Sequence, residues 1–435
     1  MKILIVSLNY APEHTGIAPY AAGLAEGLSS RGHTVRVITG VPHYPAWSNF
    51  TGFTGWRREE VLGEVAVTRR RHYIADGGRG LSRVSMELSF GAASATESWH
   101  EPDVVVCLSP ALFAAAAVVA RARLQHVPVV VWVQDFYGAG ASELGAHWAA
   151  SALLFRVERA VLRSADAVTV IHERFSNHAI EHLGILDHRV AVVRNWSHHG
   201  TRVAPLDVTE TRQELGWEGR IVALHTGNMG AKQALENIVE AGRVAERRGS
   251  DVLFVLTGDG SQRDKLTTFA SGCRNVRILG PVANSGYGLM LAAADVLIVN
   301  ERPGIRDTAV PSKLTSYFQS GRPVIAATEA DSATAAEIRT SGGGMVTTPG
   351  DPAGLHEAVV NLWIDPERRR AMGESGVAFA EEHLSAVAGV AAFEQVLSRV
   401  LAGKSDVRLT DSGAPLPSRI SPEISGSPVV SVGGR

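Results

Sequence analysis

The segment LHTGNMGAKQ, residues 224–233, contains the features that decide the fold. An apolar run ends at His225, and the glycines at 227 and 230 then allow a tight turn and close backbone approach to a ligand. We expect a helix to begin near Lys232, so that free backbone amides and one cation converge on a single point. This arrangement suits a diphosphate. For one segment taken alone, an ordinary strand-to-helix turn with a solvated lysine is at least as frequent.

The same pattern recurs along the chain: short runs rich in Val and Ile, each followed by a Gly- or Pro-containing turn and a helical pattern. It is typical of parallel βα units and predicts the α/β class, with two doubly wound sheets covered by helices on both faces. We expect helices at 18–30 and 148–163. The first series of strands is expected at residues 3–8, 34–39, 65–71, 104–108, 129–133, 167–171 and 190–193. The second series is expected at residues 221–225, 252–256, 276–279, 296–300, 323–327 and 345–347.

The length of 435 residues also favours two to three domains. We predict a first Rossmann-like domain over 1–200 and a second over 201–383, with the irregular, polar segment after Trp196 as a linker. A helix over 384–402 is expected to pack back toward the first domain. Gly, Pro and Ser supply 16 of the last 33 residues, so the tail 403–435 is predicted to be disordered.

Composition excludes several classes of protein. A formal net charge of -2 argues against nucleic acid as a partner. The two cysteines, Cys107 and Cys273, lie far apart and outside any metal-binding motif, which fits a reducing cytosol and no metal site. No signal peptide is predicted, because the apolar run within residues 1–7 is too short and no small-residue cleavage pattern follows. No membrane span is predicted, because the longest apolar run, 104–120, is short and broken by Ser109 and Pro110. The missing GxGxxG and GxxxxGK[ST] motifs argue against dinucleotide oxidoreductases and P-loop phosphotransferases.

Two further turns follow predicted strands of the second domain. The glycines of LTGDG, 256–260, would admit a nucleotide base or ribose, and Asp259 would either contact the ligand or cap the next helix. The motif VPSKL, 310–314, puts Pro and Ser at a helix start and Lys313 in its first turn, as at an anion-binding terminus. Three such turns at the strand ends of one domain favour a nucleotide diphosphate, which predicts that the ligand lies in the crevice between the domains.

These motifs, with others in the same order, resemble those of the family-four retaining glycosyltransferases. The narrower resemblance is to the subgroup that builds colanic acid, O-antigen and exopolysaccharide sugars. It covers roughly residues 1–400 and is carried by NYAPE (9–13) with Gly16, PHYP (42–45), QD (134–135), RNW (194–196), GNMG (227–230) with Lys232, GDG (258–260), PSKL (311–314) and GRPVI (321–325).

The resemblance implies the GT-B fold and transfer of a sugar from a nucleotide-diphosphate sugar, usually UDP-linked, with retention at the anomeric carbon and usually without a metal. The acceptor, a glycan, a lipid-linked sugar or a small molecule, would bind the first domain. The implied catalytic residues are Lys232 and Asp135. The implied donor-binding residues are Gly16, Gly227, Asn228, Gly258, Asp259, Gly260, Pro311, Ser312, Lys313 and Leu314. For Asp135, capping of a turn is an equal alternative.

Two positions depart from the family pattern. Ser316 stands where a Glu usually precedes the glycine of GRPVI by five residues, and Asn228 stands where many relatives have an Arg. Two alternatives to transfer therefore remain open: a GT-B-type sugar-nucleotide epimerase and an inactive scaffold of the same fold. The basic run 69–72 would either meet a lipid diphosphate or the inner membrane surface, or form a solvated strand end. We expect a cytoplasmic location, and the sequence gives no oligomeric state.

Overall fold

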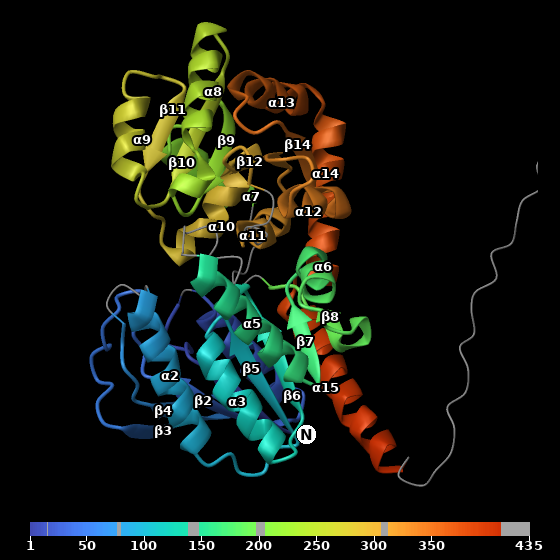
Figure 1. Ribbon diagram of the computed structural model, residues 1–435. Coiled ribbons are helices and arrows are strands. Elements are labelled where there is room, and N and C mark those ends of the chain that lie inside the picture. The colour runs from blue at the N-terminus through green and yellow to red at the C-terminus, as the bar shows by residue number, and fades with distance from the viewer. Residues whose placement is uncertain (15, 76–79, 138–147, 197–204, 306–311, 410–435) are drawn as a thin grey trace, which may run out of the picture.

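The computed structural model describes residues 1–435 except 15, 76–79, 138–147, 197–204, 306–311 and 410–435. Two lobes lie one above the other, and each is a sheet between layers of helices (Figure 1). The sheet of the N-terminal lobe has eight strands and that of the C-terminal lobe has six. The predicted α/β class with two doubly wound sheets is confirmed. The predicted boundary between residues 200 and 201 lies outside the described residues.

The N-terminal sheet has the order β3-β4-β2-β1-β5-β6-β7-β8. Its strands are β1 (Lys2–Ser7), β2 (Thr34–Gly40), β3 (Arg57–Leu62), β4 (Val65–Arg70), β5 (Val104–Ser109), β6 (Val129–Val133), β7 (Ala167–Val170) and β8 (Val190–Val192). All are parallel neighbours except β3, which runs antiparallel to β4 at the edge. The sequence prediction missed β3, because its residues RREEVL are mostly charged and exposed, and backbone pairing and ion pairs such as Glu60 with Arg69 hold the strand at the edge.

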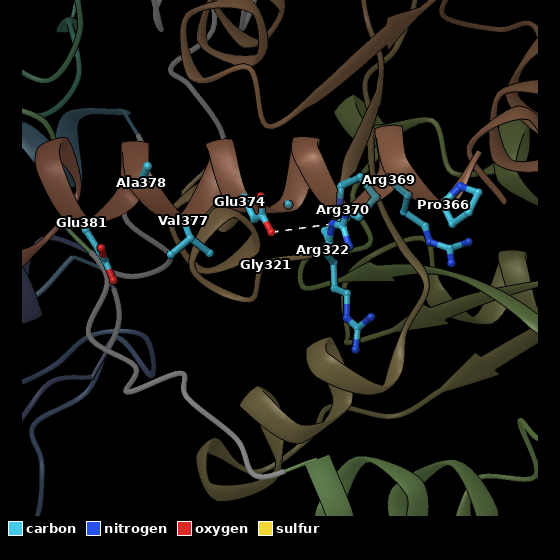
Figure 2. Close-up of a pocket in the computed structure, with 11 residues that line it drawn as sticks. Gly321, Arg322, Pro366, Arg369, Arg370, Glu374, Val377, Ala378 and Glu381 are labelled. Carbon is cyan, nitrogen blue, oxygen red and sulfur yellow. Dashed lines mark ion pairs between the residues drawn. The ribbon is translucent and has the colours of Figure 1, made fainter. Parts of the chain in front are cut away.

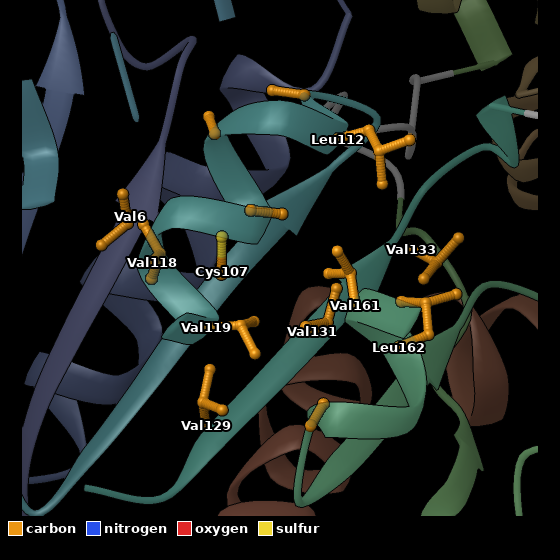
Figure 3. Close-up of a cluster of buried hydrophobic side chains, with 14 of the residues drawn as sticks. Val6, Cys107, Leu112, Val118, Val119, Val129, Val131, Val133, Val161 and Leu162 are labelled. Atoms are coloured by element: carbon orange, nitrogen blue, oxygen red, sulfur yellow. The ribbon is translucent and has the colours of Figure 1, made fainter. Parts of the chain in front are cut away.

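The core of this lobe lies on both faces of the sheet. In β6, Val129, Val131 and Val133 belong to one buried cluster, while Val130 and Trp132 belong to the cluster on the other face. Figure 3 shows the first of these clusters, between β5, β6 and the helices that cover them. Side chains of a strand alternate between faces, so a strand covered on both sides must be apolar throughout. This explains the continuous Val- and Ile-rich runs in the sequence.

The C-terminal sheet has the order β11-β10-β9-β12-β13-β14. Its strands are β9 (Ile221–Thr226), β10 (Val252–Thr257), β11 (Val276–Leu279), β12 (Val296–Asn300), β13 (Val324–Ala327) and β14 (Gly344–Thr347). This is the 3-2-1-4-5-6 order of a dinucleotide-binding sheet, in which the direction of winding reverses between β9 and β12. Ligands of such sheets bind beyond the carboxyl ends of the strands at this reversal.

The helices of the N-terminal lobe are α1 (Ala18–Ser30), α2 (Gly80–Thr96), α3 (Leu112–Leu124), α5 (Trp148–Ser164) and α6 (Glu173–Glu181), with a short 3-10 turn at Asp187–Arg189. Those of the C-terminal lobe are α7 (Pro205–Glu214), α8 (Glu236–Arg247), α9 (Arg263–Ala270), α10 (Asn284–Ala293), α11 (Lys313–Gln319), α12 (Ala333–Ser341), α13 (Pro352–Ile364) and α14 (Pro366–His383). Helix α7 falls in the stretch interpreted as linker. Its Arg212 donates to the carbonyl of Ala293 at 2.6 Å, a tertiary contact that its polar sequence does not reveal.

The last helix, α15 (Ala386–Leu409), returns to the N-terminal lobe and lies beside it (Figure 1). Its Val390, Phe393, Val396 and Leu397 belong to the same buried cluster as Trp196. The prediction of disorder from residue 403 was wrong for 403–409. No proline stands between the packed part of the helix and Leu409, so the helix continues. Residues 410–435 lie outside the described residues.

By length and composition, one helical stretch among the described residues, 366–403, is apolar enough to cross a membrane, with a window of mean hydropathy 1.4. The stretch includes α14 and the part of α15 that packs in the core. Its apolar side chains at 390, 393, 396 and 397 are buried against the first sheet. A core helix passes the same test of length and composition.

The two lobes are tied together at Arg194, which follows β8. Its guanidinium lies 2.7 Å from Glu173 of α6 in the N-terminal lobe and 3.2 Å from Glu337 of α12 in the C-terminal lobe. The chain thus places one buried ion pair across the interface between the lobes. Arg174 adds a second link, because it donates to the backbone carbonyl of Asp331.

Candidate active site

The Gly227 turn and the Gly258 turn, which follow β9 and β10, touch each other through their backbones. The Gly227 amide donates to the Thr257 carbonyl at 2.8 Å. Gly258 has φ +140°, and a Cβ there would lie 1.9 Å from the Gly227 carbonyl oxygen. Gly260 is equally crowded, since a Cβ would lie 2.7 Å from the backbone of Met229. Only glycine fits at 258 and 260, so the sequence builds one continuous backbone surface from two strand ends.

Asn228 and Asp259 lie on this surface and are both exposed. The side-chain amide of Asn228 lies close to Gly230 and Gly260. A Cβ at Gly230 would lie 3.0 Å from Asn228 Nδ2, and a Cβ at Gly260 would lie 2.7 Å from Asn228 Oδ1. The Asp259 carboxylate accepts from the Gly260 amide at 2.8 Å. It does not cap α9, whose N-cap residue is Gln262.

The predicted start of a helix near Lys232 was wrong. Residues 231–233 form a single 3-10 turn, Ala234 has φ 44°, and α8 begins at Glu236. The cause is Asn300 at the end of β12, whose buried amide donates to the carbonyls of Gln233 and Ala234 at 2.7 and 3.0 Å. These bonds hold the 3-10 turn against the end of β12, and the left-handed Ala234 separates the turn from α8, whose Asn237 amide still donates to the Ala234 carbonyl at 3.1 Å. Lys232 remains exposed beside the Gly227 turn, and its carbonyl accepts from the Arg302 amide at 2.9 Å.

Lys313 lies beneath the Gly227 turn. A Cβ at Gly227 would lie 4.0 Å from its Nζ, and Nζ is 3.1 Å from Nε2 of His225. The other ring nitrogen of His225, Nδ1, is 3.1 Å from the Ile298 carbonyl, which can only accept. His225 therefore carries its proton on Nδ1 and accepts from Lys313 with Nε2. Burial, followed by the Lys313 charge, lowers the pKa of His225 well below its usual value, so the ring is neutral.

Burial also lowers the pKa of Lys313 to about 7, against the opposing effect of Glu301. Glu301 follows β12 and is buried, and its carboxylate accepts from the hydroxyls of Thr328 and, at 2.7 Å, Thr334. Sequence reasoning missed His225 and Glu301 as parts of the site. Both stand at the ends of predicted strands, and the adjacency of β9 and β12 is the feature that brings them together.

Ser316, the departure from the family pattern, belongs to a buried hydroxyl network. Its Oγ donates to the Lys313 carbonyl at 3.0 Å and lies 3.1 Å from the Tyr287 hydroxyl. That hydroxyl is 3.0 Å from Thr226 Oγ1, which also lies 3.1 Å from the Tyr317 hydroxyl. Neutral hydroxyl groups thus surround Ser316, and they fix α11 against the end of β9.

Ser312 and Leu314 of the PSKL motif lie in different surroundings, one on the surface and the other in the core. Ser312 is the exposed N-cap residue of α11 and makes no side-chain capping bond, while Leu314 is 1% exposed and packs in the core of the lobe. Leu314 therefore holds the helix rather than facing the crevice. Pro311 lies outside the described residues.

Two sequence motifs of the N-terminal lobe meet at the carboxyl edge of its sheet. The buried Glu13 carboxylate accepts from the backbone amides of His43 and Tyr44, both at 2.8 Å. Gly16 is exposed, with φ +65°, and a Cβ there would lie 3.5 Å from the Tyr44 ring. The loop of the NYAPE motif is therefore fastened to the loop of the PHYP motif.

Asp135 follows β6 at the same edge and is exposed. Burial lowers the pKa of Arg83 on α2, but the nearby carboxylates of Glu87 and Asp135 outweigh it and help to raise that pKa above its usual value. The fully buried Glu87 accepts from Arg83 Nε at 3.0 Å and from the Tyr137 hydroxyl at 3.2 Å. Asp135 thus stands beside an ordered ionic group, whereas its neighbour Gln134 exchanges amide hydrogen bonds with Asn195.

The basic run 69–72 is largely internal. Arg69 is 1% exposed and pairs with Glu60 at 2.6 Å, Arg70 pairs with Glu97, and His72 is buried. Arg71 remains exposed, with its guanidinium over the Trp56 ring at 5.4 Å. Since two of the three arginines are already neutralised, the run is not a free basic cluster.

A cavity of about 510 Å³ lies elsewhere in the C-terminal lobe (Figure 2). It is lined by residues around Arg322 and Pro323, before β13, and by one side of α14. Arg370 and Glu374 of that helix pair across 3.9 Å. Because this cavity is at the amino end of β13, it is separate from the carboxyl-edge crevice. Among the residues that the structure describes, no cluster of three His, Cys, Asp or Glu could hold a metal ion.

Two Rossmann-like lobes, with glycine turns and lysines at the carboxyl edge of the second, define the class of GT-B glycosyltransferases. Residues 15–196 match the family described as "Glycosyl transferase 4-like domain", and residues 220–365 match "Glycosyl transferases group 1". The chain belongs to this family of retaining glycosyltransferases, which move a sugar from a nucleotide-sugar donor.

Individual relatives agree with this assignment. The chain is 32% identical to the putative colanic acid biosynthesis glycosyl transferase WcaI of Escherichia coli (strain K12), over 76% of this chain and 84% of that protein. The fold is similar to that of Anabaena Alr3699/HepE, solved in complex with UDP, with a TM-score of 0.68, 16% identity, and 92% and 100% of the two chains covered. It is also similar to WaaG, a glycosyltransferase involved in lipopolysaccharide biosynthesis, with a TM-score of 0.62, 17% identity, and 90% and 98% covered.

Proposed function

We propose that the chain transfers a sugar from a UDP-linked donor to an acceptor used in building a bacterial surface polysaccharide. The observation that carries the proposal is the contact between the Gly227 and Gly258 turns with the Lys313 amino group beneath them. It combines close backbone approach with a lysine that can carry positive charge at the same point, as a diphosphate requires. Similarity to HepE, solved with UDP and with UDP-glucose, supports uridine, and similarity to WcaI supports the class of acceptor.

In the proposed reaction, negative charge grows on the β-phosphate as the bond to the anomeric carbon lengthens. Lys232 at the rim and Lys313 beneath the turn stabilise this charge together with the backbone amide of Asn228, while Gly227 allows the phosphate to come close to the turn. Because the charge is larger in the transition state than in the bound donor, these contacts accelerate the reaction rather than only tightening binding. Gly258, Asp259 and Gly260 contact the nucleoside.

The N-terminal lobe supplies the acceptor side. We propose that Asp135, at the end of β6, contacts an acceptor or donor-sugar hydroxyl, and that Gly16 lets its loop approach the donor phosphates. The fastening of that loop by Glu13 supports the second role, because it fixes the backbone around the glycine. Domain closure would bring the two edges together and exclude water.

Calorimetry with UDP, ADP and GDP tests donor recognition, followed by a panel of UDP-sugars. We expect UDP to bind most tightly. A protein that binds none of the three would be an inactive scaffold of this fold. Mass spectrometry of the UDP-sugar incubated alone tests for an epimerase, which would convert the donor without any acceptor. We expect an intact donor, or slow release of free sugar and UDP.

The role of Lys232 is tested with Lys232→Ala. The loss of one charged donor to a developing oxyanion should lower kcat about 10²–10³-fold with the fold intact. The matched control is Lys265→Ala in the same lobe, since Lys265 is 68% exposed and pairs with Glu236 on the surface. A Lys232→Ala enzyme with unchanged turnover would remove Lys232 from the mechanism.

A further inference from the structure

His225 is a buried polar side chain that the family motifs do not account for. It is the last residue but one of β9, it is 0% exposed, and it lies among apolar strand residues. A buried imidazole without partners destabilises a fold, so its hydrogen bonds define what it does. The ring nitrogens lie 3.1 Å from the Ile298 carbonyl and 3.1 Å from Lys313 Nζ, and the ring also contacts the backbone of Asn228 in the Gly227 turn.

These two bonds fix the chemistry of the pair. The carbonyl forces the proton onto Nδ1, which leaves the lone pair of Nε2 directed at Lys313. A neutral acceptor orients the lysine without neutralising it, whereas a carboxylate at the same distance would form a salt bridge and hold the charge permanently. The pair can therefore exist with Lys313 either charged or uncharged.

Among the described residues, the carboxylate that acts on Lys313 is Glu301, which follows β12, and the ring bonded to Nζ is His225 of β9. Tyr317 on the same helix and Tyr287 on α10 belong to the neighbouring hydroxyl network around Thr226 and Ser316. Glu301 is engaged by two threonine hydroxyls, and burial raises the pKa of the Tyr317 phenol, which keeps it neutral. A nucleoside diphosphate beside Gly227 would add its negative charge to that of Glu301 and so favour the charged form of Lys313.

We propose that His225 is a positioning residue that holds Lys313 beneath the Gly227 turn, and that Lys313 takes up a proton from solvent when a nucleoside diphosphate binds. The step forms one N–H bond at Nζ and breaks none in the ligand. It rests on the proposed function, because it requires the diphosphate to bind at this turn. Its consequence is that donor binding is proton-linked, and that the ammonium is present when charge develops on the β-phosphate.

The lowered pKa of Lys313 gives the expected size. With a pKa of about 7 in the free protein, Lys313 is mostly uncharged at pH 8 and recharged in the complex. Binding should then take up about 0.9 proton per UDP at pH 8 and about 0.5 at pH 7. Affinity for UDP should fall up to about tenfold per pH unit above 7, until the pKa of the complex is reached.

The test is calorimetric titration of the full chain with UDP at pH 8, in Tris and in HEPES, because the difference between the two heats gives the protons taken up. We expect uptake near the stated value for the wild type and for the surface control Lys265→Met. Lys313→Arg, whose guanidinium is always charged, should bind UDP with no uptake. His225→Phe should weaken UDP binding and alter the uptake, and His225→Gln, which keeps an acceptor, should restore both in part.

The outcomes separate the two proposals. Normal UDP binding without proton uptake in the wild type would overturn this inference and leave the proposed function standing. Uptake that persists in Lys313→Arg would also overturn it, because the proton would then belong to another group. Failure of the wild type to bind UDP would overturn the proposed function and, with it, this inference. Lys313→Arg keeps the test decisive if the buried His225 variants fail to fold.

Discussion

Replacing Gly258 with alanine tests the contact between the two glycine turns. The new Cβ would lie 1.9 Å from the Gly227 carbonyl oxygen, and Cβ atoms essentially never approach another atom closer than 3.0 Å, so the turn must shift by at least about 1 Å. The φ of +140° adds strain for any residue with a Cβ. Strain and overpacking together should cost about 2–4 kcal/mol of unfolding free energy. A shift of this size in groups that hold a diphosphate should weaken UDP binding about 100-fold.

The matched control is Gly249→Ala in the same lobe. Gly249 also has a positive φ, +62°, but a Cβ there would have no atom within 4 Å, so only strain is added. The assays are urea unfolding and calorimetric titration with UDP. We expect the control to lose about 1 kcal/mol and to bind UDP normally. If Gly258→Ala bound UDP as tightly as the control, the turns would not form the diphosphate site.

Three further predictions concern the rest of the fold. Arg194→Met should destabilise the protein by about 3–5 kcal/mol in urea unfolding, because it leaves the buried Glu337 carboxylate without its partner; a loss below about 1 kcal/mol would contradict the buried pair. Gly389→Ala should lower the unfolding free energy by about 1–3 kcal/mol, because its Cβ would lie 2.3 Å from the Trp196 ring. The control is Gly403→Ala on the same helix, where a Cβ would have nothing within 4 Å. Equal stability of the two variants would refute the docking of α15. Burial, followed by His43, lowers the pKa of His72 from 6.5 to about 3, so its stability contribution is complete above pH 6.5 and is lost as the pH falls toward 3. The melting temperature should therefore drop less between pH 7 and 4 in His72→Gln than in the wild type, and an equal drop would show that His72 is not the group responsible.

The strands of the buried sheets were predictable because both faces are covered, which makes each strand apolar throughout, as in β6. The charged edge strand β3 was not, since backbone pairing rather than side-chain burial holds it. The start of α8 was misplaced for a tertiary reason, because Asn300, 67 residues from Gln233, anchors the separate 3-10 turn that precedes the helix.

The site residues also divide into those that local sequence identifies and those that only the tertiary structure brings together. The glycine turns and Lys313 could be identified from local sequence, because tight turns after strands require glycine and the motif order is characteristic. His225 and Glu301 could not, because their relevance depends on β12 lying beside β9. Ser316 is unexpected in the motif but is explained by its bonds to Tyr287 and the Lys313 carbonyl.

A crystal structure of the chain with UDP tests the central claim most directly. The account predicts β-phosphate oxygens about 3 Å from the backbone amide of Asn228 in the Gly227 turn and from Lys313 Nζ, with the uridine beside Gly258. UDP bound at another edge of the sheet, or with its phosphates turned away from Gly227 and Lys313, would contradict it.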